Sequence, residues 1–127
     1  MHLILIAIGG ALGALLRYLF SLIFSKFLCT SFPCGTLFVN VVGSFLITFF
    51  MFVFNIGTID PMFRYFFVIG FLGSFTTLSS ITYDTLSLIR EGNFFYAIIN
   101  LSSNFLISLV AGIFGFFVAR LLFFREG

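Results

Sequence analysis

The sequence predicts an all-α integral membrane protein with four transmembrane helices, and three observations lead to that fold class. Of the 127 residues, 61% are hydrophobic and 8% are charged, whereas roughly 25% of a soluble domain is charged. The mean hydropathy is +1.27. Four apolar segments approach or exceed the roughly 20 residues that cross a bilayer as a helix. They are residues 3–27, 35–54, 62–89 and 94–124, and together they make residues 1–127 a single transmembrane domain.

The first segment, residues 3–27, lacks the basic start of a signal peptide, and its apolar pattern continues past Arg17. We therefore expect it to be retained as a helix. Gly9 and Gly13 form a GxxxG step, which permits close packing against another helix. Arg17 either extends its charge to the nearer membrane surface or places a fixed positive charge in a vestibule near an aqueous entrance.

The second segment, residues 35–54, follows a short loop that contains Cys29 and ends at Cys34. These cysteines either pair on an oxidising side of the membrane or remain free thiols. Asn40 lies five residues into the segment, with Thr36 four residues earlier on the same helical face. Asn40 either makes an interhelical hydrogen bond of about 1 kcal/mol or lines an ion path.

The third segment, residues 62–89, contains seven Ser/Thr hydroxyls between Gly70 and Thr85. Gly70, Gly73 and these hydroxyls can interrupt a helix, and irregular backbone at membrane depth must be buried in protein or line a polar cavity. Carbonyls freed at such an interruption can bind Na⁺. Alternatively, the hydroxyls bond back to the carbonyls of a continuous helix weakened by glycine.

The fourth segment, residues 94–124, carries Asn100, Asn104 and Ser108 at steps of four, which predicts one polar stripe on an apolar helix. No Asp or Glu lies in the middle of any segment, and Asp84 is near the end of the third. A cation transporter would be expected to carry a carboxylate within the membrane, so the donors indicate an anion. One His and scattered hydroxyls form no nucleophile–base pair, so we expect no enzyme and no catalytic residue. We also expect no nucleic-acid partner.

The Lys and Arg residues only weakly determine the orientation of the chain in the membrane. The side that holds the termini has Arg64, Arg120 and Arg125, and the opposite side has Lys26 and Arg90. Because a Lys/Arg excess in short loops sets orientation, a nearly balanced chain could insert both ways and assemble as an antiparallel dimer.

Three motifs in order resemble the CrcB/Fluc family of small fluoride channels. They are "GGALGALLRY", "GTLFVNVVGSF" and "GFLGSFTTLSS", with a "REG" turn after the third segment. The resemblance spans nearly the whole chain. It implies passive efflux of fluoride through an antiparallel dual-topology dimer in the cell inner membrane, where the protein is multi-pass and surrounded by the lipid bilayer.

The resemblance also implies roles for individual residues. A structural Na⁺ at the dimer centre would be held by backbone carbonyls of the broken third helix, at Gly73 and Thr76. The vestibule charge would be Arg17. The anion path would use Asn40, Asn104 and Ser108, with Asn100 as a further candidate. Thr36 joins this predicted path through its own position, one helical turn from Asn40, rather than through the resemblance.

Two positions depart from the family pattern. Leu78 and Ile81 occupy the places of two pore phenylalanines, and neither has an aromatic ring edge to offer an anion. Phe75 is three residues too early to be assumed a substitute. The chain is therefore either a homodimeric channel that relies on amides and hydroxyls, or one half of a heterodimer with a paralogue. A transporter of another anion and a non-conducting structural subunit are the remaining readings.

Overall fold

The computed structural model describes residues 1–123, and every regular element in that range is helical. Four stretches are long and apolar enough to cross a membrane, which confirms the predicted fold class. They are α1 His2–Phe27, α2 Cys34–Asn55, the run Met62–Arg90 and α6 Phe94–Phe123. Each bound lies within one residue of its expected position, except that the expected end at residue 124 lies outside the described residues.

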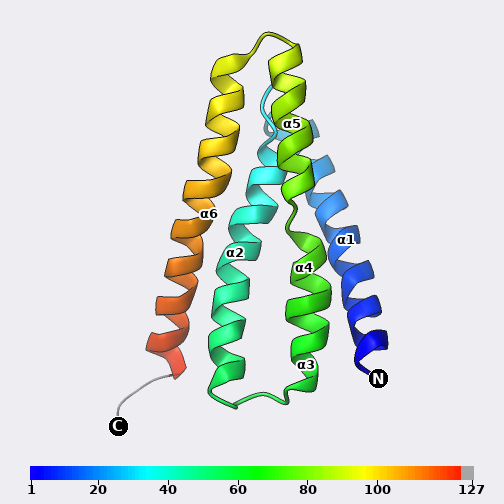
Figure 1. Ribbon diagram of the computed structural model, residues 1–127, viewed down its shortest axis with the longest axis vertical. Helices are drawn as coiled ribbons and strands as arrows, with labels where there is room; N and C mark the ends of the chain where they lie inside the picture. The colour runs from blue at the N-terminus through cyan, green and yellow to red at the C-terminus, as the bar shows by residue number, and fades with distance from the viewer. Residues whose placement is uncertain (124–127) are drawn as a thin grey trace.

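The third membrane-crossing run is divided into several elements. They are α3 Met62–Arg64, the π-helix η1 Tyr65–Leu72, α4 Gly73–Phe75 and α5 Leu78–Arg90. Between α4 and α5 the backbone is extended at Thr76 (φ −85°, ψ 151°) and Thr77 (φ −152°, ψ 118°), and we call these two residues the break. The break is visible as a thin connection in the third helix (Figure 1).

The break confirms that the third helix is interrupted. Of the residues expected to interrupt it, the hydroxyl-bearing Thr76 and Thr77 do so, whereas Gly70 and Gly73 remain helical. Gly73 has helical torsion angles, φ −61° and ψ −31°. Gly70 lies within η1, where a Cβ would come within 2.7 Å of the Ile6 carbonyl oxygen of α1. Glycine is therefore needed at position 70 for close helix packing, and the chain leaves the helix only at the threonines.

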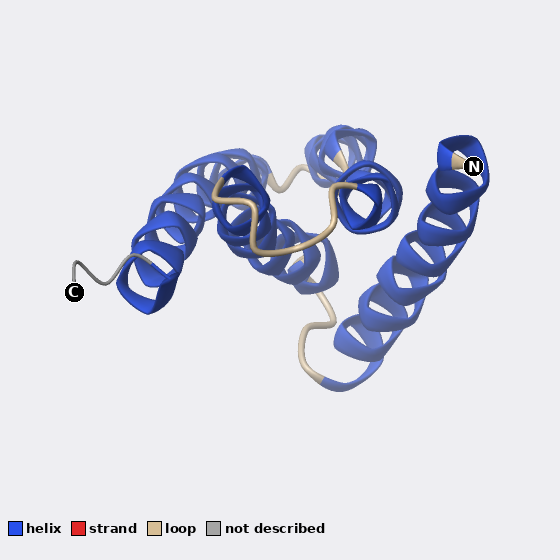
Figure 2. Cartoon of the chain, turned by 90° about the horizontal axis from the view of Figure 1, so that it is seen from below, coloured by secondary structure: helices blue, strands red, loops and turns tan. Residues whose placement is uncertain are grey.

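The four membrane-crossing stretches lie side by side (Figures 1 and 2). The N-terminus, the α2–α3 connection and the end of α6 lie at one end of the bundle, and the other two connections lie at the opposite end (Figure 1). Viewed along the bundle, α1 and α6 lie on opposite sides of α2 and the third helix (Figure 2). The break is therefore flanked by helices on both sides.

Glycines allow close backbone contacts between α1 and η1 and between α2 and α6. A Cβ on Gly9 or Gly13 of α1 would overlap with the carbonyls of Phe66 or Phe71 in η1. A Cβ on Gly115 of α6 would overlap with the Phe45 carbonyl of α2. Such close approach of backbones drives helix association in lipid, where the hydrophobic effect between helices is absent.

The loop between α1 and α2 is closed by a disulfide between Cys29 and Cys34, whose Cα atoms lie 6.0 Å apart. The sequence left this pairing open. The bond joins the residues after the end of α1 to the first residue of α2.

The interior of the bundle contains a high proportion of polar groups. Many large apolar side chains of α1 and α6 are exposed, as expected for a surface in contact with lipid. The buried polar residues are Thr36, Asn40, Thr85, Asn100 and Asn104. Because polar groups in a membrane are costly unless they are bonded or functional, these residues locate the candidate site.

Candidate functional site: a groove beside a broken helix

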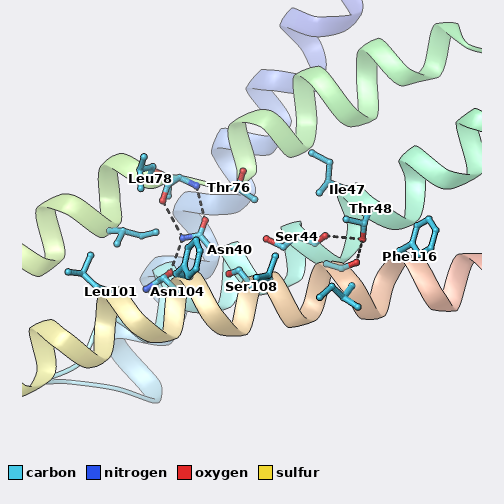
Figure 3. Close-up of a pocket in the computed structure, with 16 residues that line it drawn as sticks. Asn40, Ser44, Ile47, Thr48, Thr76, Leu78, Leu101, Asn104, Ser108 and Phe116 are labelled. Atoms are coloured by element: carbon cyan, nitrogen blue, oxygen red, sulfur yellow. Dashed lines mark hydrogen bonds between the residues drawn. The ribbon is translucent and has the colours of Figure 1, made fainter.

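A groove of about 850 Å³ lies between α2, the break with the start of α5, and α6. Its polar lining includes Asn40, Ser44, Asn104 and Ser108, and the rest of the wall is largely apolar. Figure 3 shows these side chains between the translucent helices, with Leu78 above Asn40 and Asn104. The groove therefore brings together three of the predicted path residues, Asn40, Asn104 and Ser108.

The amide of Asn40 bonds both backbone groups of Thr77. Thr77 N–H donates to Asn40 Oδ1 at 2.8 Å, and Asn40 Nδ2 donates to the Thr77 carbonyl oxygen at 3.2 Å. In a continuous helix the Thr77 N–H would instead donate to the carbonyl of Gly73, four residues earlier. The Asn40 side chain therefore replaces bonds that the break removes.

The Thr77 side chain has a similar effect on the next turn. It caps α5 by accepting a hydrogen bond from Ser80 N–H at 3.1 Å. In a continuous helix that N–H would donate to the Thr76 carbonyl. The carbonyls of Gly73 and Thr76 have thus both lost their helical donors, and these are the two residues at which the sequence predicted a sodium site. Within residues 1–123, no group of three His, Cys, Asp or Glu side chains is placed to hold a metal ion.

Asn40, Asn104 and Asn100 form a continuous series of hydrogen bonds, which we call the asparagine chain. Asn40 Nδ2 donates to Asn104 Oδ1 at 3.0 Å, and Asn104 Nδ2 donates to Asn100 Oδ1 at 3.0 Å. The chain ends where Asn100 Nδ2 donates to Thr85 Oγ1 of α5, also at 3.0 Å. It joins α2, α5 and α6. Asn40 Nδ2 also donates to the Thr77 carbonyl of the break, so both of its N–H donors are already used, one in the asparagine chain and one at the break.

Ser108 differs from the asparagines. Its Oγ is buried, and no hydrogen-bond partner for it is found among the described residues. A buried hydroxyl without a partner costs about 1–3 kcal/mol. Ser108 is one of the residues that line the groove, so this unused hydroxyl lies within the groove wall.

Arg17, Thr36 and Asp84 lie elsewhere, around a second cavity of about 600 Å³ between α1, α2 and α5. Arg17 Nε donates to the Ser74 carbonyl oxygen at 3.0 Å. Thr36 Oγ1 donates to Asp84 Oδ2 at 2.7 Å. Thr36 therefore faces this cavity, although it is one helical turn from Asn40. The sequence shows only that Asp84 lies near the end of the third segment. The packing of α5 against α2 shows that its carboxylate lies at the same cavity as Arg17.

Comparison with known proteins identifies the family. The family model described as "CrcB-like protein, Camphor Resistance (CrcB)" matches residues 4–116. The chain belongs to the CrcB family. A relative from Sulfurihydrogenibium sp. (strain YO3AOP1), "Fluoride-specific ion channel FluC", is 48% identical over 120 residues, covering 94% of this chain and 97% of the relative.

Two further relatives of this CrcB-family chain carry the same description. The one from Thermosipho melanesiensis is 43% identical, covering 94% of this chain and 97% of its own length. The one from Campylobacter fetus subsp. fetus is 42% identical, covering 93% of each chain. The likeness to these three relatives extends over nearly the whole length of each protein.

Both aliphatic departures of this CrcB-family chain lie at the groove. Leu78 and Ile81 line it, and Leu78 is 76% exposed. Phe75 lies in the interior, 3% exposed, where its ring stacks on Phe71. Phe75 therefore does not replace an aromatic ring at the groove wall.

Proposed function

We propose that this chain is a fluoride-selective ion channel that lowers cytoplasmic fluoride by passive efflux across the cell inner membrane. The observation that carries this proposal is the Ser108 hydroxyl, buried and without a partner at the wall of a groove inside a four-helix membrane protein. Relatives that match nearly the full chain are described as fluoride-specific ion channels. Both facts support an anion as the ligand. A hydroxyl can donate a hydrogen bond to an anion, and fluoride is the anion named in the description of the relatives.

The driving force needs no coupled reaction. Hydrogen fluoride crosses lipid as a neutral weak acid and dissociates in a near-neutral cytoplasm, which traps the anion. A negative-inside potential drives a unit negative charge outward with about 2.3 kcal/mol per 100 mV. A pore that replaces the hydration of fluoride and binds it weakly at several sites is then sufficient.

The donors proposed for this replacement lie along the groove. Ser108 offers its free hydroxyl, and the start of α5 adds backbone N–H groups that lack partners within the helix. The positive end of a helix dipole favours an anion at such a helix start. Arg17, in the second cavity, supplies the positive charge that attracts the anion to the vestibule.

We also propose an antiparallel dimer with a structural Na⁺ at its centre. The carbonyls of Gly73 and Thr76 fit this role because the hydrogen bonds of Thr77 and Ser80 are directed elsewhere. Backbone carbonyls are suitable ligands for Na⁺ at a broken membrane helix. When bound, the cation would neutralise the dipoles of these carbonyls where two subunits meet.

The aliphatic residues Leu78 and Ile81 at the groove raise the question of whether the dimer is a homodimer or a heterodimer. We propose the homodimer, because the Ser108 hydroxyl and the start of α5 are supplied by this chain itself. A partner that provides aromatic rings opposite Leu78 and Ile81 is the alternative. Liposomes that release fluoride only when a paralogue is reconstituted with this chain would establish the heterodimer.

A growth assay tests the physiological role. The chain is expressed in bacteria that lack their own fluoride channels, in medium containing fluoride at pH 5.5 and at pH 7.5. We expect the chain to restore growth, with the larger benefit at pH 5.5, where more hydrogen fluoride enters the cell. The control is the same strain with an empty vector. If the chain is present in the membrane but the cells remain as fluoride-sensitive as this control at both pH values, efflux by this chain alone is contradicted.

A further inference from the structure

Asn40 lies where two features of the molecule meet. Its side chain lines the groove, and its Oδ1 accepts the Thr77 N–H of the break at 2.8 Å. The same amide nitrogen donates to Thr77 O at 3.2 Å and to Asn104 Oδ1 at 3.0 Å. Asn40 is 6% exposed, so water cannot easily replace these bonds.

The bond to Asn40 Oδ1 has a consequence for the Gly73 carbonyl. The Thr77 N–H is the donor that a regular helix would give to that carbonyl. Without Asn40, the part-buried Thr77 N–H would need another acceptor, because a backbone N–H shielded from water is costly to leave unpaired. The nearest helical solution is the Gly73 carbonyl, which would close the break by one hydrogen bond.

We propose that Asn40 is a positioning residue that keeps the Gly73 carbonyl free to bind a cation, and that it thereby couples the groove to the break. An anion that accepts an N–H of Asn40 in place of Asn104 or Thr77 changes the hydrogen bonds of the amide that holds the break open. Occupancy of the carbonyl pair in turn favours the geometry in which Asn40 holds Thr77, because coupling between two sites is reciprocal. This inference rests on the proposed channel and its cation site.

The test measures Na⁺-dependent stability rather than ion flux. The purified full chain is unfolded by heat in detergent, with NaCl replacing N-methylglucamine chloride at constant ionic strength. The wild-type midpoint should rise with Na⁺ and saturate. In Asn40→Ala the Na⁺ concentration for half the effect should rise roughly five- to ten-fold, since a competing hydrogen bond of ordinary strength now occupies the Gly73 carbonyl.

Matched variants separate positioning from packing. Asn40→Asp keeps an oxygen that accepts the Thr77 N–H but loses the amide donors, so its Na⁺ dependence should stay within two-fold of wild type, as an ordinary hydrogen bond would remain. Thr85→Val removes the acceptor at the far end of the asparagine chain. It should lower the midpoint without changing the Na⁺ concentration for half the effect. If Asn40→Ala does not fold, Asn40→Val fills the space and serves the same purpose.

The possible results are distinct. Wild-type Na⁺ dependence in Asn40→Ala or Asn40→Val would overturn the coupling. Equal weakening in the Ala and Asp variants would overturn the role of the acceptor oxygen. If the unfolding midpoint of the wild-type chain does not change with Na⁺, both the cation site and this inference are overturned. Fluoride flux from the same preparation would then show that the proposed channel function still stands.

Discussion

Ser108 is the residue at which a packing role and an ion-path role make opposite predictions. A serine that stabilises helix packing uses its hydroxyl, as Ser103 does by donating to the Ile99 carbonyl at 2.5 Å. The Ser108 Oγ is buried without a partner. A packing role predicts that its removal destabilises the fold, whereas an ion-path role predicts that its removal impairs flux.

Ser108→Ala should lower fluoride flux roughly five-fold, because one hydrogen bond of about 1 kcal/mol to the anion is lost. The thermal midpoint should stay unchanged or rise, since no bond within the protein is broken. Flux is measured with a fluoride electrode on liposomes, and stability by thermal unfolding in detergent. Ser103→Ala is the control and should retain flux. Normal flux with a lowered midpoint in Ser108→Ala would make Ser108 a packing residue.

The helical spacing of Asn100, Asn104 and Ser108 was sufficient to predict a shared face, and two of the three line the groove. It could not predict which of them would bond to other parts of the protein. The partners that decide this are distant in sequence: Asn40 lies 64 residues from Asn104. Thr36 faces the second cavity for the same reason, because its acceptor Asp84 comes from α5.

At the scale of secondary-structure elements, the glycines allow close contacts between helices and do not form the break. The sequence predicted correctly that the third helix is interrupted, but it overestimated the effect of Gly70 and Gly73. Propensity alone cannot locate the interruption, because the break at Thr76 and Thr77 depends on replacement bonds from Asn40 and from the Thr77 cap. The GxxxG step at Gly9 and Gly13, by contrast, was visible in the sequence and lies at the contact between α1 and η1.

Gly13→Ala should destabilise the bundle by roughly 2 kcal/mol or more, an amount typical of overpacking. A Cβ there overlaps with backbone atoms of Phe71, which cannot move aside independently of η1. Gly10→Ala is the matched control in the same helix, since its Cβ would lie 3.3 Å from the Ser74 hydroxyl, a side-chain atom that can rotate. Its midpoint should stay level or rise. Equal midpoints for the two variants, from unfolding in the same detergent, would contradict the packing assigned to α1.

Charge balance is the property of the whole molecule that bears on assembly. The topology predicted from the sequence gives three Lys/Arg residues on the side of the termini and two on the other side. A dimer of two identical, oppositely inserted chains requires such balance, because each orientation must be populated. The antiparallel arrangement of two chains is therefore tested by changing the balance of Lys and Arg residues between the two sides.

Asn55→Lys with Ile56→Lys changes the count from three against two to five against two, and should fix one orientation. Thr30→Lys and Ser31→Lys with Arg64→Gln gives two against four and should fix the other. Each set expressed alone should lose fluoride flux, and co-expression should restore it. Labelling of an added surface cysteine in a Cys29→Ser, Cys34→Ser background reports the orientation. Full flux from a chain shown to insert in one direction would exclude an antiparallel dimer.

The most direct measurement is the release of fluoride and chloride from the same liposomes, reconstituted with this chain alone. The liposomes are loaded with both potassium salts, held in Na⁺-containing buffer, and valinomycin is added to allow charge-balancing K⁺ efflux. Ion-selective electrodes record both anions. The account predicts rapid fluoride release while chloride stays at the rate of protein-free liposomes. Equal release of the two anions, or no fluoride release from correctly folded chain, would contradict a fluoride-selective channel formed by this chain.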